Sequence, residues 1–153
     1  MKEQYAVCHL QRGSGNDSGM SCHIERKDAQ GKTYVPDNAD RSRTHLNMEL
    51  VSFLDGVRNR TEAIQYRIDH AGLTRKVAGN QCKAIRIILT GTHEQMMKIH
   101  EEGRLERWME ANLKWLHETF GKENVVSCVL HMDEKTPPAC YHRTHRHCRK
   151  ATS

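Results

Sequence analysis

The sequence lacks the features of a membrane protein and of a disulfide-stabilised one. No apolar run approaches the roughly 20 residues of a spanning helix, and the N-terminus has no signal-peptide stretch. The six cysteines are scattered and form no C-x-x-C pair, so reduced thiols are expected. With 153 residues, 37% of them hydrophobic and 28% charged, the chain is expected to be one soluble, cytoplasmic domain with no membrane partner.

Positive charge is unevenly distributed. The net charge is +5, which suits a polyanionic partner without requiring one. Four of the five excess charges lie in residues 138–153, which contain no acidic residue. The excess therefore belongs mostly to the tail.

The hydrophobic pattern predicts an α+β fold with a mainly antiparallel sheet and helices packed on one face, incomplete at the C-terminus. Apolar runs predict strands at residues 5–10, 84–90 and 124–131, and the glycines of residues 13–19 predict a flexible loop. Helical spacing predicts helices at 50–57 and 61–72, then one long helix after a Thr92–Gln95 capping box, kinked at Gly103 and ended by Gly121. Met96, Met97 and both tryptophans are expected in the core.

Two polar segments contain residues suited to DNA chemistry. His23 and Arg26 follow the glycine-rich loop; a histidine can act as a nucleophile, although a lone surface histidine is more often only solvated. Residues 40–49 hold two arginines, hydroxyls, an imidazole and an amide before an expected helix. Such groups suit phosphate contacts, and a helix cap with a solvated flank is an equal alternative.

A third segment, H-M-D-E-K-T-P at residues 131–137, follows the last predicted strand. An imidazole and two carboxylates at a strand end can hold a divalent cation. A cation that activates a phosphate needs around three protein ligands and an open position. This segment therefore requires further histidines nearby.

In this order the three segments resemble the motifs of the Mob/Pre family of plasmid mobilization relaxases, also called plasmid recombination enzymes, within the HUH endonucleases. H-I-E-R at residues 23–26 matches the family's H-x-E-R, S-R-T-H-L-N at 42–47 matches S-R-[ST]-H-L-N, and residues 131–137 match H-x-D-E-x-T-P. The resemblance implies that residues 1–137 are the N-terminal part of a relaxase catalytic domain. Met48 stands where family members often carry a tyrosine, which removes a stacking contact there.

The resemblance implies binding and nicking of DNA, single-stranded or folded as a hairpin, at a plasmid transfer origin. His23 would attack the scissile phosphate and leave a covalent 5′-phosphoryl enzyme and a free 3′-hydroxyl. Arg26 would disfavour the protonated imidazole. The DNA contacts would come from Arg41, Arg43, His45 and Asn47. Tyr34, in the same polar region, is the alternative nucleophile.

The resemblance also implies a divalent metal ion, Mn²⁺ or Mg²⁺. His131 and Glu134 would bind it, with Asp133 in support. A homodimer would form through a C-terminal region that this chain lacks.

The tail departs from the family pattern. After T-P the family continues H-x-H, whereas this chain has Pro138, Ala139 and Cys140. Back-translation shifted by one base permits H-L-H followed by an alternating apolar strand. We therefore expect residues 138–153 to be a basic His/Cys-rich tail, out of frame and disordered, which leaves an exposed sheet edge and a truncated, inactive chain.

Three alternatives remain open at this point. In the first, His and Cys residues of the tail serve as substitute metal ligands; these are Cys140, His142, His145, His147 and Cys148. In the second, the chain is a non-enzymatic DNA-binding fragment. In the third, it is an HUH replication initiator, against which the S-R-T-H-L-N segment argues.

Overall fold

A computed structural model describes residues 7–13, 18–28, 30–134 and 139–144. The strands are β1 (Val7–Gly13), β2 (Met48–Glu49), β3 (Ala84–Thr90), β4 (Val125–His131) and β5 (Ala139–Thr144). The helices are α1 (Ser18–Glu25), α2 (Arg60–Asp69), α3 (His93–Glu101) and α4 (Leu105–Phe120), with 3-10 turns η1 (Arg41–Leu46) and η2 (Lys122–Asn124).

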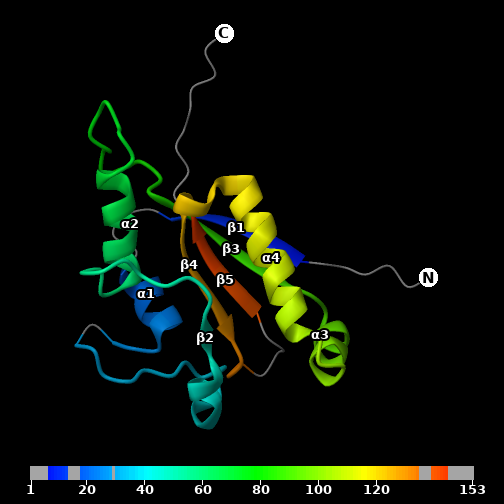
Figure 1. The fold of residues 1–153 in the computed structure, drawn as a ribbon. Helices are drawn as coiled ribbons and strands as arrows, with labels where there is room; N and C mark the ends of the chain where they lie inside the picture. Colours follow the sequence, from blue (N-terminus) through cyan, green and yellow to red (C-terminus); the bar gives the residue numbers. More distant parts are fainter. Residues whose placement is uncertain (1–6, 14–17, 29, 135–138, 145–153) are drawn as a thin grey trace.

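The strands form one sheet in the order β1-β3-β5-β4-β2, and every pair is antiparallel. β5 lies between β3 and β4, in the middle of the sheet (Figure 1). Its register places Cys140 opposite Leu89 on one side and opposite Leu130 on the other.

One face of the sheet packs against α4, which crosses it in Figure 1. Ile87 and Leu130 of the sheet form a buried cluster with Met109 and Leu116 of α4. Leu116 is fully buried, so this cluster is the main apolar core.

The opposite face packs against α2. Ala84 meets Ile64 and Ile68 of α2 in a second, smaller cluster. Because alternate residues of a strand point to opposite faces, His131 faces this side when Leu130 faces α4. His131 is fully buried there, so the second face carries polar groups as well as apolar ones.

The predicted α+β class and antiparallel sheet are confirmed, with one correction: helices cover both faces, not one. The prediction of one long helix after residue 92 is also wrong, because two helices, α3 and α4, occupy this part of the chain. Gly103 lies between them with φ +67°, a left-handed conformation that interrupts the helix rather than kinking it. The Thr92–Gln95 capping box and the stop at Gly121 are confirmed.

The helix expected at residues 50–57 is wrong. Leu50 instead extends the pairing of β2 with β4, because its amide donates a hydrogen bond to the carbonyl of Cys128. Gly56 then adopts φ +83°, and Asn59 caps α2. Leu50 and Val51 pack against the main core cluster from an irregular segment, while Leu54 is exposed, and helical spacing alone does not distinguish this arrangement from a helix.

The expectation of disorder after residue 137 is wrong for residues 139–144. They form β5, a strand bonded on both sides, so these residues do not leave the open sheet edge that we expected. Backbone pairing needs no apolar periodicity, which explains why the pattern missed it. Residues 145–153 lie outside the described residues.

The remaining predictions are confirmed only in part. The strands expected at 84–90 and 124–131 and the helix near 61–72 are confirmed, the second strand beginning at Val125. The first strand runs on to Gly13, whereas helix α1 was missed. Met96 is buried as predicted, but Met97 and Trp115 are 36% and 42% exposed. Cys8, Cys22 and Cys82 are free thiols. No helix in the described part of the chain has the length and apolar character to cross a membrane.

Candidate active site and its relatives

The candidate nucleophile lies at the end of a short helix. His23 is in the last turn of α1, which ends at Glu25. Arg26 follows with φ +56°, a left-handed conformation uncommon for a residue with a side chain. The chain then reverses, so that the amide of Tyr34 donates to the carbonyl of Arg26 (2.8 Å). This turn points the Arg26 side chain toward the end of β4.

The guanidinium of Arg26 joins the first motif to the third. Its Nε and Nη2 donate to the two carboxylate oxygens of Asp133, at 3.0 and 2.9 Å. Nη2 also donates to Nδ1 of His131 (2.6 Å) and lies 3.3 Å from Oε1 of Glu134. Nη1 donates to the backbone carbonyl of His23 (2.8 Å). Arg26 is 3% exposed and Asp133 is fully buried, so this is a bidentate ion pair shielded from water.

The charge states of this cluster follow from its contacts. Burial opposes the charge of Asp133, but hydrogen bonds from Arg26, Asn47 and Thr44 outweigh burial and hold its pKa well below the usual range. Burial, and after it the charge of Arg26, lowers the pKa of His131 to about 3. His131 is therefore neutral near pH 7, and its Nδ1 accepts the Arg26 hydrogen bond.

The second motif reaches the same carboxylate. The hydroxyl of Thr44 donates to Oδ2 of Asp133 (3.0 Å), and the amide of Asp40 donates to the carbonyl of Asp133 (2.6 Å). Asp40 also caps η1, since its side chain accepts from the amide of Ser42 (2.9 Å). Figure 1 shows η1 beside the end of β4. All three motifs, separated by up to 108 residues, therefore meet at Arg26 and Asp133.

The predicted DNA-contact residues have different surroundings. Arg41, Arg43 and His45 are exposed on η1, as a DNA contact requires. Asn47 instead accepts two backbone hydrogen bonds through its side-chain oxygen, from Met132 (2.7 Å) and from Asp133 (3.2 Å). The structure thus gives Asn47 an anchoring role, which holds η1 against the end of β4.

His23 is partly buried beside this cluster. Burial is the largest cause that lowers its pKa, and the positive charge of Arg26 is the next. The charges of Glu134 and Asp133 oppose this shift. The net result is a histidine that is neutral at pH 7, as the sequence predicted from Arg26 alone.

The described residues do not fit a divalent metal ion. Nδ1 of His131 and Oε1 of Glu134 lie 3.8 Å apart, but the Arg26 guanidinium contacts both atoms. A metal cation between these two atoms would be repelled by the positive charge of Arg26. Within the described ranges, no three His, Cys, Asp or Glu side chains form a group that could hold a metal. Pro138 lies outside those ranges, and metal binding by His131 and Glu134 stays a prediction.

Sequence reasoning missed a second buried arginine. Arg60, 1% exposed, starts α2 and forms ion pairs with Glu25 and Glu49. One local signal was available: a cation in the first turn of a helix opposes the helix dipole and calls for an acidic partner. The partners, 35 and 11 residues away, could not be identified from spacing.

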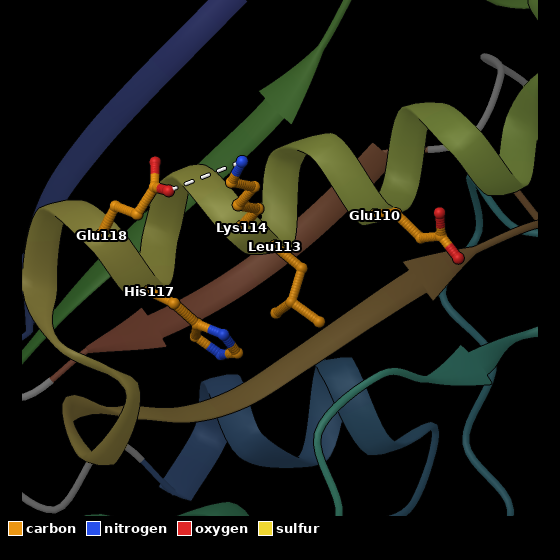
Figure 2. A pocket seen from close by; sticks show the side chains of 5 residues that line it. All are labelled: Glu110, Leu113, Lys114, His117 and Glu118. Carbon is orange, nitrogen blue, oxygen red and sulfur yellow. Dashed lines mark ion pairs between the residues drawn. The ribbon is translucent and has the colours of Figure 1, made fainter.

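A separate surface hollow lies along α4 (Figure 2). It has a volume of about 410 Å³, and the five residues that line it all belong to that helix: Glu110, Leu113, Lys114, His117 and Glu118. Lys114 and Glu118 form an exposed ion pair at 3.8 Å. The predicted site residues are not in this hollow.

Comparison with known proteins identifies the family. Residues 2–148 match the model of the plasmid recombination enzymes, and the match includes β5. A plasmid recombination enzyme type 2 from Staphylococcus aureus is 27% identical over 135 residues, covering 87% of this chain and 31% of the relative. A plasmid recombination enzyme from Bacillus thuringiensis is 26% identical and covers 88% and 29%. The chain spans about a third of the length of these relatives.

The fold agrees with solved structures. The MobM relaxase domain, Mn-bound and in complex with plasmid pMV158 oriT DNA, superposes with a TM-score of 0.77 at 23% identity, covering 92% of this chain and 69% of that one. The same domain bound to 26-nucleotide oriT DNA gives 0.65 at 16%, covering 97% and 74%. Because the family model matches nearly the whole length of this chain, the chain belongs to the plasmid recombination enzyme (Mob/Pre) family.

Proposed function

We propose that this chain carries the DNA-cleaving site of a plasmid mobilization relaxase, with His23 as nucleophile. A nitrogen of His23 bonds to the scissile phosphorus while the bond from phosphorus to the 3′ oxygen breaks. The other ring nitrogen releases its proton, and the departing oxygen takes one up. The product is a 5′-phosphoryl enzyme with a free 3′-hydroxyl, and religation reverses the step.

One observation carries this proposal: the three motifs converge on Arg26 and Asp133. Arg26 donates to the carbonyl of His23 and so fixes the helix end that carries the imidazole. Together with burial, its charge keeps that imidazole neutral, the form that attacks phosphorus. Arg26 is too buried to serve as a DNA contact, so it acts through His23.

η1 is the proposed DNA-binding element. Arg41, Arg43 and His45 are exposed beside the cluster, where they contact the phosphates near the scissile bond. Removing the cation from one phosphate contact should reduce the salt dependence of binding by about one unit of slope or slightly less. Arg43→Gln tests this in a fluorescence anisotropy titration with single-stranded DNA tiled across the sequence flanking this gene.

We further propose that the chain in its present form does not complete the reaction. The family motif has histidines at the positions of Pro138 and Cys140, and the described residues do not fit a metal ion without them. The motif-restored variant, Pro138→His with Cys140→His, tests this. We expect a covalent DNA adduct, seen as a band shift in denaturing gels with Mn²⁺, from the motif-restored variant and not from the parent chain.

Two controls identify the nucleophile in the motif-restored variant. His23→Ala should abolish the adduct, and Tyr34→Phe should preserve it. A retained adduct in the His23→Ala protein would refute the assignment of His23. An adduct from the parent chain would show instead that it is active, with Cys140 and His142 as the first substitute ligands to test.

A second candidate function is DNA binding without cleavage. The exposed basic η1 favours it, because this element needs no metal ion. It becomes the conclusion when both the parent and the motif-restored chains bind origin DNA in a salt-dependent way and neither forms an adduct.

The remaining proposals concern the gene and the assembly. Resequencing across codons 137 and 138 tests the frame hypothesis, and a neighbouring frame that closes at once would refute it. Cytoplasmic location, a role in conjugation and a homodimer through a further C-terminal region are also proposed. Size-exclusion chromatography of a longer gene product tests the dimer.

A further inference from the structure

A second buried arginine lies behind the helix end that carries His23. Arg60 is 1% exposed at the start of α2. Its Nη1 lies 3.1 Å from Oε1 of Glu25, and its Nη2 bonds to Oε1 of Glu49. The guanidinium also lies over the ring of Phe53, at 5.6 Å from the ring centroid. We call this group the Arg60 clamp.

The Arg60 clamp joins segments that the proposed reaction uses. Glu25 is the last residue of α1, two residues after His23 and next to Arg26. Glu49 belongs to β2, which pairs with β4 opposite Val129. A single cation thus holds the end of the nucleophile helix against the strand that follows η1.

The backbone takes part in the clamp as well. The amide of Arg60 donates a hydrogen bond to Oε1 of Glu25 (2.9 Å), so this carboxylate has a hydrogen bond from the main chain of Arg60 and an ion pair with its side chain. A carboxylate at the start of a helix is also favoured by the helix dipole. Glu25 is therefore held in one position, and the adjacent turn with it.

The turn after α1 is therefore held at two successive residues, Glu25 and Arg26. Arg26 bonds to Asp133 at the end of β4, while Glu25 bonds to Arg60 on α2. We propose that Arg60, through Glu25, is a positioning residue that sets the orientation of His23 for attack on the phosphate. This inference rests on the proposed function of His23.

The rate of attack should depend on the clamp more strongly than DNA binding does. A displacement of about 1 Å in a reacting group can cost roughly a hundredfold in rate. η1 keeps its own anchors, the Asp40 cap and the bonds of Asn47 to the end of β4. Loss of the clamp should therefore lower the rate at saturating DNA while the DNA concentration for half-saturation changes little.

The experiment compares Arg60→Met with Arg60→Lys in the motif-restored variant, with Ile68→Ala as a matched control. Ile68 is a buried apolar residue of the same helix, and its truncation weakens α2 without removing a charge of the clamp. We expect Arg60→Met to slow adduct formation about tenfold to a hundredfold at saturating DNA. Arg60→Lys, which keeps the cation, should recover part of the rate.

Amide hydrogen exchange provides a second measurement that needs no catalysis, performed on the parent chain. Arg60→Met should speed exchange in residues 19–27 while β3 and α4 keep their protection. Ile68→Ala should not produce this local pattern. Glu49→Gln, which removes the negative charge of one partner at a half-exposed position, serves if Arg60→Met does not fold. It should slow adduct formation by about threefold, because the hydrogen bond from Arg60 to a neutral amide is weaker than the bond to a carboxylate.

Different results would overturn the positioning role of Arg60 and the proposed function of His23. Unchanged exchange in residues 19–27, or an equal loss of rate in Ile68→Ala at the same melting temperature, would overturn the positioning role of Arg60. A motif-restored variant that forms no adduct with Arg60 intact would overturn the proposed function instead. In that case the exchange comparison still decides whether Arg60 holds the end of α1.

Discussion

The two faces of the sheet are built from different chemistry. On the α4 face, Ile87, Leu130 and Leu116 are buried among other apolar side chains. On the opposite face, β4 ends at His131 and Asp133 follows two residues later, both fully buried, and Arg26 after α1 and Arg60 at the start of α2 are buried as well. One face is stabilised by removing apolar area from water, whereas the other adds to a smaller apolar cluster a set of charges that are paired because burial would otherwise penalise them.

This difference shows where function can be placed. An apolar core tolerates changes that preserve volume, because its contacts have no direction. A buried ion pair depends on each partner, since the removal of one leaves the other charged and desolvated. The polar face therefore fixes the geometry of His23 more strictly than the apolar face does.

The largest effect is expected at Asp133. Asp133→Ala leaves the buried Arg26 guanidinium without its bidentate partner and should cost about 3–5 kcal/mol in the free energy of unfolding. Urea denaturation at pH 7 measures this. The double substitution Arg26→Met with Asp133→Leu is the control, because it removes both charges and should cost less than the single change. A loss below about 1 kcal/mol for Asp133→Ala would contradict the buried pair.

Leu116→Ala is the matching change on the apolar face. Leu116 is fully buried, so its truncation should cost about 2–5 kcal/mol from reduced burial and the remaining cavity. Unlike Asp133→Ala, it should leave exchange in residues 19–27 close to the parent value at a temperature where both proteins are folded. Selective loosening of α1 by Leu116→Ala would mean that the two faces are not independent.

Asn47→Ala should have a smaller effect. It leaves the amides of Met132 and Asp133 without their common acceptor, at an expected cost of about 1–3 kcal/mol. Thermal unfolding measures this loss. Arg43→Gln, on the exposed side of η1, is the control and should change stability by less than about 0.5 kcal/mol. Equal stability of the two variants would argue that Asn47 contacts DNA rather than the protein.

The same contrast explains how much the sequence could predict. The apolar runs at residues 84–90 and 124–131 identified two strands, because a run rich in β-branched residues is visible in a local pattern. The three motifs marked His23, Arg26 and Asp133 by resemblance, but their contacts join residues more than 100 positions apart. Arg60 matched no motif, and β5 had no apolar alternation. Only pairing in three dimensions reveals these two.

The smallest expected effect concerns the pKa of His23. Burial and Arg26 lower this pKa, and the negative charge of Glu134 partly opposes them. Glu134→Gln removes the opposing charge, so the pKa of His23 should fall further below its ordinary value.

An NMR titration of the histidine rings in the presence of a chelator measures this shift, with the signal assigned through His23→Ala. Glu118→Gln, near the C-terminal end of α4, is the control and should leave the titration of His23 unchanged. Because only the neutral imidazole attacks phosphorus, the proposed reaction of His23 should be lost as the pH falls through its pKa. The loss should therefore begin at a lower pH in Glu134→Gln. A shift to higher pH would mean that Glu134 does not act on His23 through its charge.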